Sequence, residues 1–211
     1  MTNEDSPVIT EVDGCIAVVR FSRPDLRNPL SLATLRELER TTSSLFTCDD
    51  IEAVIFTGTD GVFASGANIR ELARLDFATA LEFSRVGQDL FQTIANASQV
   101  TIAAINGYCI GGGLDLALSC DIRIASKSAV FSHPGARLGI ITGWGGTQRL
   151  PRIIGRARAL EFFATARRYT SLEALKMGLV SQLGDPVISQ ARKLADGKKE
   201  GGRESATFSQ R

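Results

Sequence analysis

The feature that most constrains this chain is an order of elements that occurs twice: an apolar strand, a glycine-rich turn and a helix. The first copy lies at residues 58–71, and the second copy lies at residues 105–118. Strands that alternate with helices favour βαβ crossovers and a mainly parallel sheet. A glycine-rich turn that opens a helix presents free backbone N–H groups at the positive end of the helix dipole, where an anion can bind. The sequence therefore predicts an α/β fold with two candidate anion-binding turns.

The remaining elements follow from periodicity and turn residues. Residues 8–12 and 15–21 form a predicted hairpin around Asp13-Gly14, and Ser31 is a predicted helix cap before leucines at helical spacing. Residues 196–211 are charged and rich in Gly and Ser, so this tail is expected to be disordered. Further strands are predicted at 53–57, 101–105, 122–125 and 129–131, and helices at 68–75, 77–97, 114–118 and beyond Arg149.

Charge and composition exclude several classes of protein. The 211 residues carry a formal net charge of +1, which argues against a nucleic-acid binder and a polybasic membrane-surface protein. No apolar run is long enough to span a membrane, and the N-terminus lacks the order of a signal peptide. The four cysteines form no CxxC pair, which favours free thiols in a reducing cytoplasm. With one histidine and no cysteine cluster, no metal site is expected.

The first candidate site is the segment FASGANIREL, residues 63–72. Its small residues at 64–67 would let a ligand approach the backbone closely. A tight strand-to-helix turn without a ligand explains the segment equally well.

The second candidate site is residues 106–115, which contain Gly111, Gly112 and Gly113 in a row. Three glycines before a helix are entropically costly, and their spacing fits neither a dinucleotide fingerprint nor a P-loop. Asp115 lies one helical turn beyond Gly112, so its carboxylate can lie near whatever the Gly112 N–H binds. The alternative is a first-turn acid that only favours the helix dipole.

The third candidate site runs from Phe131 to Leu150 and contains His133, the single histidine. A lone histidine is more often a packed, hydrogen-bonded residue than a catalyst, and that alternative is favoured for His133. No GxSxG motif accompanies it.

Taken together, these segments resemble the enoyl-CoA hydratase/isomerase family, also called the crotonase superfamily. The resemblance covers residues 8–183 and implies a spiral of ββα units with a shortened C-terminal helical region. It divides the chain into a crotonase-like core, 1–183, and a short helix with a polar tail, 184–211. The stretches that carry it are FASGANIREL, AINGYCIGGGLDLALSCDIRIA, LGIITGWGGTQRLPRIIGRARA and YTSLEALKMGLVSQL.

The resemblance implies an acyl-CoA thioester substrate and no separate cofactor. The backbone N–H groups of Ala67 and Gly112 would form an oxyanion hole for the thioester oxygen as it becomes an enolate. A homotrimer or a dimer of trimers is the family's usual assembly, and Arg27 is a candidate contact for the CoA phosphates, although a solvated loop arginine is slightly favoured. The residues implied to bind substrate are Ser65, Ala67, Asn68, Ile69, Arg70, Gly111 and Gly112.

The acid and base groups depart from the family pattern. Hydratases of the family carry two glutamates; the first falls at Asp115 and the second at Gly135, which has no side chain. Asn68 stands where an aspartate is common. His133 precedes Gly135 by two residues, and on a strand that spacing shares one face, so His133 is a candidate substitute.

Two classes of function stay open on these grounds. The first is an acyl-CoA enzyme, with hydration of a 2-enoyl-CoA as the family default and isomerisation or decarboxylation as one-acid alternatives. The second is a CoA-thioester-binding subunit with weak or no catalysis.

Overall fold

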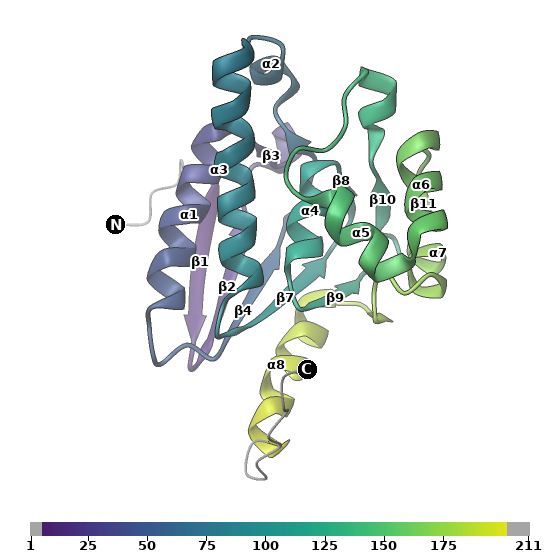
Figure 1. Cartoon of the computed structure of the whole chain (residues 1–211). Coiled ribbons are helices and arrows are strands. Elements are labelled where there is room, and N and C mark those ends of the chain that lie inside the picture. Colours follow the sequence, from purple (N-terminus) through teal and green to yellow (C-terminus); the bar gives the residue numbers. More distant parts are fainter. Residues whose placement is uncertain (1–5, 202–211) are drawn as a thin grey trace, which may run out of the picture.

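Two mainly parallel sheets carry the fold, and the chain passes repeatedly from one to the other (Figure 1). The computed structural model describes residues 6–201. The larger sheet has the strand order β1-β2-β4-β7-β9-β12; β1 and β2 pair antiparallel, and the other neighbours pair in parallel. Its strands are β1 Val8–Asp13, β2 Ile16–Phe21, β4 Ala53–Thr57, β7 Val100–Ile105, β9 Ile122–Ala125 and β12 Gln182–Leu183.

Strands of the larger sheet are followed along the chain by strands of a smaller sheet. Strands β4, β7 and β9 are followed by β5, β8 and β10, which lie in the same spatial order in a four-stranded sheet, β11-β10-β8-β5. This repeated step confirms the predicted spiral of ββα units. The strands concerned are β5 Val62–Ala64, β8 Tyr108–Ile110, β10 Val130–Ser132 and β11 Tyr169–Thr170, and a separate pair joins β3 Pro29–Leu30 to β6 Gly66–Ala67.

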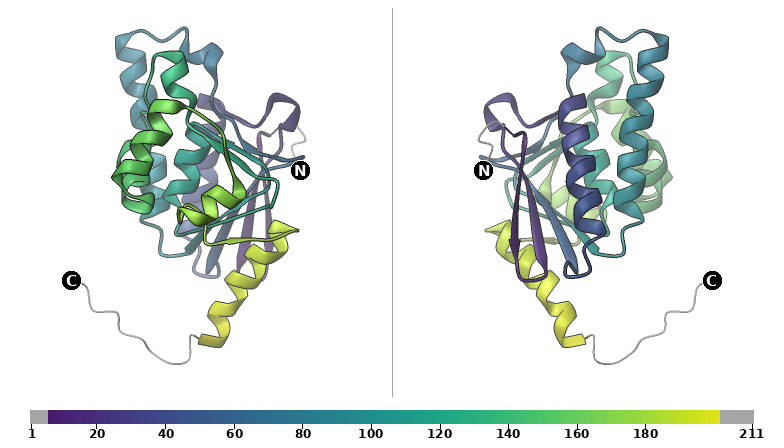
Figure 2. Two further views of the ribbon diagram at one scale, coloured as in Figure 1. Left: turned by 90° about the vertical axis from the view of Figure 1, so that its right-hand side faces the viewer. Right: turned by 90° about the vertical axis from the view of Figure 1, so that its left-hand side faces the viewer.

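Helices cover both faces of the larger sheet. Alternate residues of β4 show why: Val54 and Phe56 belong to the main core beneath α1 and α3, whereas Ala53 and Ile55 pack against α8 on the other face. Figure 2 shows α8 on the far side of the sheet from α1 and α3. The α-helices are α1 Leu32–Phe46, α2 Ile69–Leu72, α3 Phe77–Ala95, α4 Gly112–Ser119, α5 Gly146–Ile154, α6 Arg156–Thr165, α7 Ser171–Lys176 and α8 Val187–Gly201.

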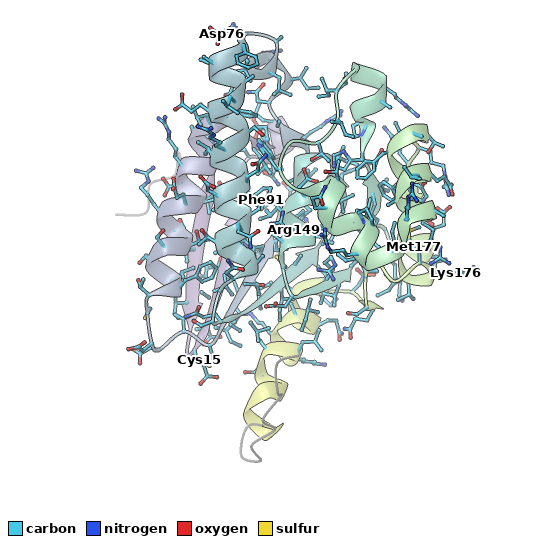
Figure 3. All side chains as sticks on the ribbon, viewed as in Figure 1. Cys15, Asp76, Phe91, Arg149, Lys176 and Met177 are labelled. Carbon is cyan, nitrogen blue, oxygen red and sulfur yellow. The ribbon has the colours of Figure 1, made fainter. Side chains whose placement is uncertain are left out.

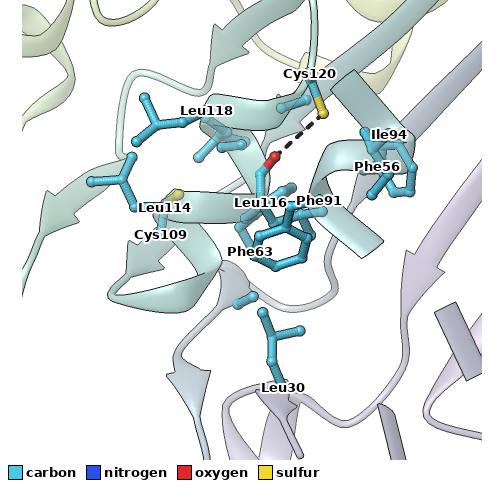
Figure 4. Packing of buried hydrophobic residues seen from close by; sticks show 14 of the residues in the cluster. Leu30, Phe56, Phe63, Phe91, Ile94, Cys109, Leu114, Leu116, Leu118 and Cys120 are labelled. Atoms are coloured by element: carbon cyan, nitrogen blue, oxygen red, sulfur yellow. Dashed lines mark hydrogen bonds between the residues drawn. The ribbon is translucent and has the colours of Figure 1, made fainter. Parts of the chain in front are cut away.

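Helix α4 lies at the centre of the molecule, and all eight of its residues are buried. Leu114, Leu116 and Leu118 extend from it into a core that also contains Phe63 and Phe91 (Figure 4). Because α4 is surrounded by apolar groups, any polar side chain on it needs a partner inside the protein. This requirement applies to Asp115.

Most element predictions are confirmed, including the hairpin, the strand at 53–57 and the capping of α1 by the Ser31 side chain, which accepts from the Thr34 N–H. Helix α4 begins at Gly112, two residues earlier than predicted, and α2 is shorter than predicted. Helix α8 continues to Gly201, so the expectation of disorder from residue 196 is wrong for 196–201; residues 202–211 lie outside the described residues.

One correction affects the site. Residues 134–138 are not a continuation of a strand, because β10 ends at Ser132 and the 3₁₀ helix η2, Pro134–Leu138, follows. Proline fixes its own φ and is favoured at the start of a helix, so Pro134 accounts for the change. His133 and Gly135 therefore do not share one strand face, and the prediction that they do is wrong.

Candidate active site

A cavity of about 260 Å³ lies between α2, α3, α4 and the segment that follows β10. Ala67, Gly111, Gly112, Asp115 and His133 all line it, so the structure brings together the three segments that the sequence singled out. The rest of the wall is largely apolar and includes Ile69, Leu72, Leu75, Ala80, Phe83, Leu138, Ile140 and Ile141.

Each of the three consecutive glycines has its own structural reason. Gly111 has φ 55° and ψ −123°, a conformation open only to glycine, and it turns the chain from β8 into α4. A Cβ on Gly112 would lie 2.3 Å from Cζ3 of Trp144, and one on Gly113 would lie 2.3 Å from the Ala64 carbonyl oxygen. As the first residue of α4, Gly112 has no partner for its N–H within the helix.

The Ala67 turn lies against the same glycines. Gly66 has φ 85°, and a Cβ there would lie 2.6 Å from the Gly112 nitrogen. Only a glycine at 66 lets the two backbone segments approach this closely. The buried Asn28 side chain fixes the neighbouring loop: its Nδ2 donates to the Val62 carbonyl at 2.7 Å, and its Oδ1 accepts from the Arg23 N–H at 2.8 Å.

Asp115 and His133 form a buried pair in the cavity wall. Nε2 of His133 lies 3.0 Å from Oδ1 of Asp115, and the two residues are 4% and 1% exposed. The hydroxyl of Thr142 donates to the other carboxylate oxygen, Oδ2. The His133 ring also packs edge-on against Phe163, with 5.2 Å between ring centroids. Asp115 is therefore more than a first-turn acid at the start of α4, because its carboxylate joins two other segments of the cavity wall.

Burial and the charge of Asp115 shift the pKa values of two nearby groups, Cys109 and Arg149. Burial raises the pKa of the Cys109 thiol well above its usual value, and the charge of Asp115 adds to this effect. Burial lowers the pKa of Arg149, and the charge of Asp115 partly offsets that change. Arg149 donates to the Trp144 carbonyl at 3.1 Å, and Phe91 of α3 packs edge-on against the Trp144 ring with 5.7 Å between ring centroids. Figure 3 labels Arg149 and Phe91.

Comparison with known proteins agrees with this architecture. Residues 11–207 match the family model described as enoyl-CoA hydratase/isomerase. The chain belongs to the enoyl-CoA hydratase/isomerase family. It is 37% identical to a short-chain-enoyl-CoA hydratase of Clostridium acetobutylicum over 90% of this chain and 74% of that one. It is also 37% identical to a crotonyl-CoA hydratase of Syntrophomonas wolfei, over 89% of this chain and 74% of the other.

Solved structures of the enoyl-CoA hydratase/isomerase family share the fold. An enoyl-CoA hydratase from Bacillus anthracis superposes with a TM-score of 0.87 at 33% identity, covering 90% of this chain and 76% of that one. The family resemblance and the crotonase-like fold class inferred from sequence are both confirmed.

The residues predicted to bind substrate in this family member separate into two groups. Ser65, Ala67, Ile69, Gly111 and Gly112 line the cavity. Among the described residues, Asn68 and Arg70 are not part of its wall: the Asn68 side chain caps α2 by accepting from the Arg70 N–H at 3.0 Å. Arg27 is exposed and lies in a left-handed turn, and its contact with the CoA phosphates stays a prediction.

Sequence reasoning missed two members of the site, Thr142 and Trp144. Both lie in the quoted stretch LGIITGWGGTQRL, but neither periodicity nor spacing indicates their partners. Trp144 lies between glycines of two helices, since a Cβ on Gly87 would also lie 2.3 Å from its Nε1. A bulky residue within a glycine-rich loop was the only available signal.

Within residues 6–201, no group of three His, Cys, Asp or Glu side chains is placed to hold a metal ion. No helix of that same stretch combines the length and the apolar character needed to cross a bilayer.

Proposed function

We propose that this chain acts on acyl-CoA thioesters by holding the thioester oxygen with the backbone N–H groups of Ala67 and Gly112. The observation that carries the proposal is that both residues line one cavity and that their turns touch through Gly66. Preorganised donors stabilise charge that develops on the oxygen, and each is typically worth about 10² to 10³ in rate. The curated relatives are named as hydratases of enoyl-CoA and crotonyl-CoA, which supports the same substrate class.

The proton-transfer side of the proposed site consists of Asp115 and His133, which line the cavity beside the two donors. The second glutamate expected for a hydratase has no counterpart at Gly135. A side chain there has no room either, because a Cβ would lie 2.6 Å from the Ile140 carbonyl oxygen. Isomerisation of an enoyl-CoA requires one group that removes and returns a proton, so this observation favours isomerisation as a second candidate beside hydration.

A panel of acyl-CoA thioesters tests the proposal. Purified protein is incubated separately with crotonyl-CoA, a 3-enoyl-CoA and a malonyl-type thioester, and products are separated by chromatography; binding of each is measured by calorimetry. Turnover of crotonyl-CoA supports hydration, and turnover of the 3-enoyl-CoA alone supports isomerisation. Binding without turnover supports a non-catalytic CoA-thioester binder, and absence of binding contradicts the proposal.

Three further features rest on the family resemblance and stay predictions. They are the absence of a separate cofactor, assembly as a homotrimer or a dimer of trimers, and a cytoplasmic location. Size-exclusion chromatography with light scattering measures the assembly directly.

A further inference from the structure

The single histidine of the chain has two ring nitrogens in different surroundings. Nε2 is committed to Asp115 at 3.0 Å. Nδ1 has no hydrogen-bond partner among the described residues. Every fully buried polar side-chain atom of those residues has a partner, so Nδ1 is not fully buried. His133 lines the cavity, and because Nε2 is taken by Asp115, Nδ1 is the ring nitrogen left for a ligand or water.

The carboxylate of Asp115, in contrast, is held at both of its oxygens. One carboxylate oxygen is held by His133 and the other by the Thr142 hydroxyl. The first residue of α5, Gly146, packs closely against the Asp115 carboxylate, because a Cβ on Gly146 would lie 2.1 Å from Oδ1. Asp115 could take a proton from substrate only through a lone pair beside these contacts, in a place where its carboxylate has little room to turn.

We infer that His133 is the group that transfers the proton, through Nδ1, and that Asp115 is a positioning residue that fixes the imidazole tautomer. A carboxylate only accepts hydrogen bonds, so Asp115 requires the ring to donate from Nε2. In the neutral ring, the other nitrogen then carries the lone pair. Thr142 holds the carboxylate in turn, so a chain of two contacts fixes the orientation of the ring.

This inference rests on the proposed function and specifies its reaction as a proton shift within an enoyl thioester. The Nδ1 lone pair takes a proton from the α-carbon of a 3-enoyl-CoA. The electrons of that C–H bond form a new double bond, and the thioester carbonyl pair moves to the oxygen held by the Gly112 and Ala67 N–H groups. The imidazolium then returns the proton to the γ-carbon as the oxygen pair re-forms the carbonyl, which gives the 2-enoyl-CoA with no other reactant.

Nitrogen NMR tests the tautomer in the intact chain, because a ¹⁵N-labelled protein without a histidine tag contains one imidazole. We expect a protonated Nε2 and a bare Nδ1. Asp115→Asn should yield a mixture of tautomers, since an amide both donates and accepts. Ser132→Ala is the matched control: it removes a buried neighbouring hydroxyl that donates to the Ala166 carbonyl, and the ring signals should stay unchanged. A proton on Nδ1 in the unaltered protein would overturn the inference, whether or not any variant folds.

Isotope exchange tests the step itself. The unaltered protein, His133→Gln and Ser132→Ala are incubated in D₂O with a saturated acyl-CoA, whose α-proton exchange is followed by NMR, and with a 3-enoyl-CoA. Glutamine can still donate to Asp115 but has no basic nitrogen, so exchange and isomerisation should each fall at least about 10²-fold while acyl-CoA binding persists. Ser132→Ala should retain both activities.

The outcomes separate the inference from the proposed function. If the unaltered protein neither binds nor converts acyl-CoA, both fail. If it converts acyl-CoA and His133→Gln does so equally well, only the role of His133 is overturned. For Asp115→Asn, the expected signature of positioning is a lower kcat with little change in KM, together with the altered tautomer.

Discussion

The six-membered ring of Trp144 lies directly against Gly112, so that a Cβ on Gly112 would be 2.3 Å from Cζ3 of the indole. The same indole donates from Nε1 to the Phe83 carbonyl at 3.3 Å and packs 5.2 Å from the Phe83 ring centroid. Trp144 therefore ties α3 to the turn that begins α4. Any substitution at Gly112 displaces this ring, so an effect on activity does not by itself identify the N–H as the cause.

A Trp144→Ala background removes that ambiguity. Gly112→Ala and Gly112→Pro both add a Cβ, but only proline lacks the N–H. In this background we expect the alanine variant to retain the turnover of its parent and the proline variant to lose about 10² to 10³ of it. Turnover of an acyl-CoA substrate and thermal melting are measured on the same samples. Equal turnover in the two folded variants would show that the Gly112 N–H is not a donor to substrate.

Asp115→Asn should affect stability and turnover together. The substitution keeps the size of a buried side chain and alters its contacts with His133 and Thr142, so the free energy of unfolding should fall by about 1 to 3 kcal/mol. Turnover should fall by at least about 10². The control is Asp121→Asn, because Asp121 accepts from the N–H and hydroxyl of Thr101 and does not line the cavity. A stability loss at Asp115 with intact turnover would indicate a purely structural role.

Gly135→Glu is not expected to create a hydratase. The sequence alone suggests that a glutamate here would supply the missing acid, but its Cβ would meet the Ile140 carbonyl oxygen at 2.6 Å. We expect Gly135→Ala and Gly135→Glu to lower the free energy of unfolding by about 1 to 3 kcal/mol, the usual cost of overpacking. Gly197→Ala on α8 meets nothing within 4 Å and should leave stability equal or higher. Denaturant unfolding and crotonyl-CoA hydration measure both effects; hydration gained by a stable Gly135→Glu protein would contradict this.

The four thiols should separate into two classes. Cys109 and Cys120 are buried, and burial raises the pKa of Cys120 to about 12, whereas Cys15 and Cys48 are half-buried. At pH 8 in the folded protein, a thiol reagent should modify Cys15 and Cys48 alone, and all four cysteines after unfolding. A Cys15→Ser, Cys48→Ser double variant should show no labelling while folded.

The raised pKa of Cys120 also sets a direction for stability. In the unfolded chain this thiol loses its proton near its usual value of 9.0, while the folded protein retains it up to about 12. The unfolded state therefore binds fewer protons between these values, and stability should fall as pH rises through that range. Cys120→Ala should weaken this dependence in denaturant unfolding at pH 9 and 10.5.

Local patterns were sufficient to predict most of the fold. Asp13-Gly14, Ser31 and the apolar run 53–57 each carry their own signal, because turns, caps and buried strands depend on neighbouring residues. The likeness of the two glycine-rich turns also indicated correctly which segments lie in the cavity wall.

Contacts between distant segments could not be predicted in this way. His133 and Asp115 are 18 residues apart on different elements, and the position of Thr142 depends on how the chain folds back after η2. A strand argument placed His133 near the site for a wrong reason, since Pro134 ends the strand. The three glycines looked like a ligand signature, yet two of them are required by the packing of Trp144 and Ala64.

Because the chain passes from one sheet to the other at each repeat, neighbouring strands set the spacing of the two turns that form the site. Strands β5 and β8 are neighbours, with Ala64 paired to Cys109, so the turns that lead to Ala67 and Gly112 start one strand spacing apart, about 4.8 Å. That interval belongs to the backbone and does not depend on which acids surround it. Side chains around the two turns, such as those at positions 115, 133 and 135, can therefore be exchanged while the spacing of the two turns is preserved. The fold thus lets its reaction vary by exchanging side chains around a fixed frame.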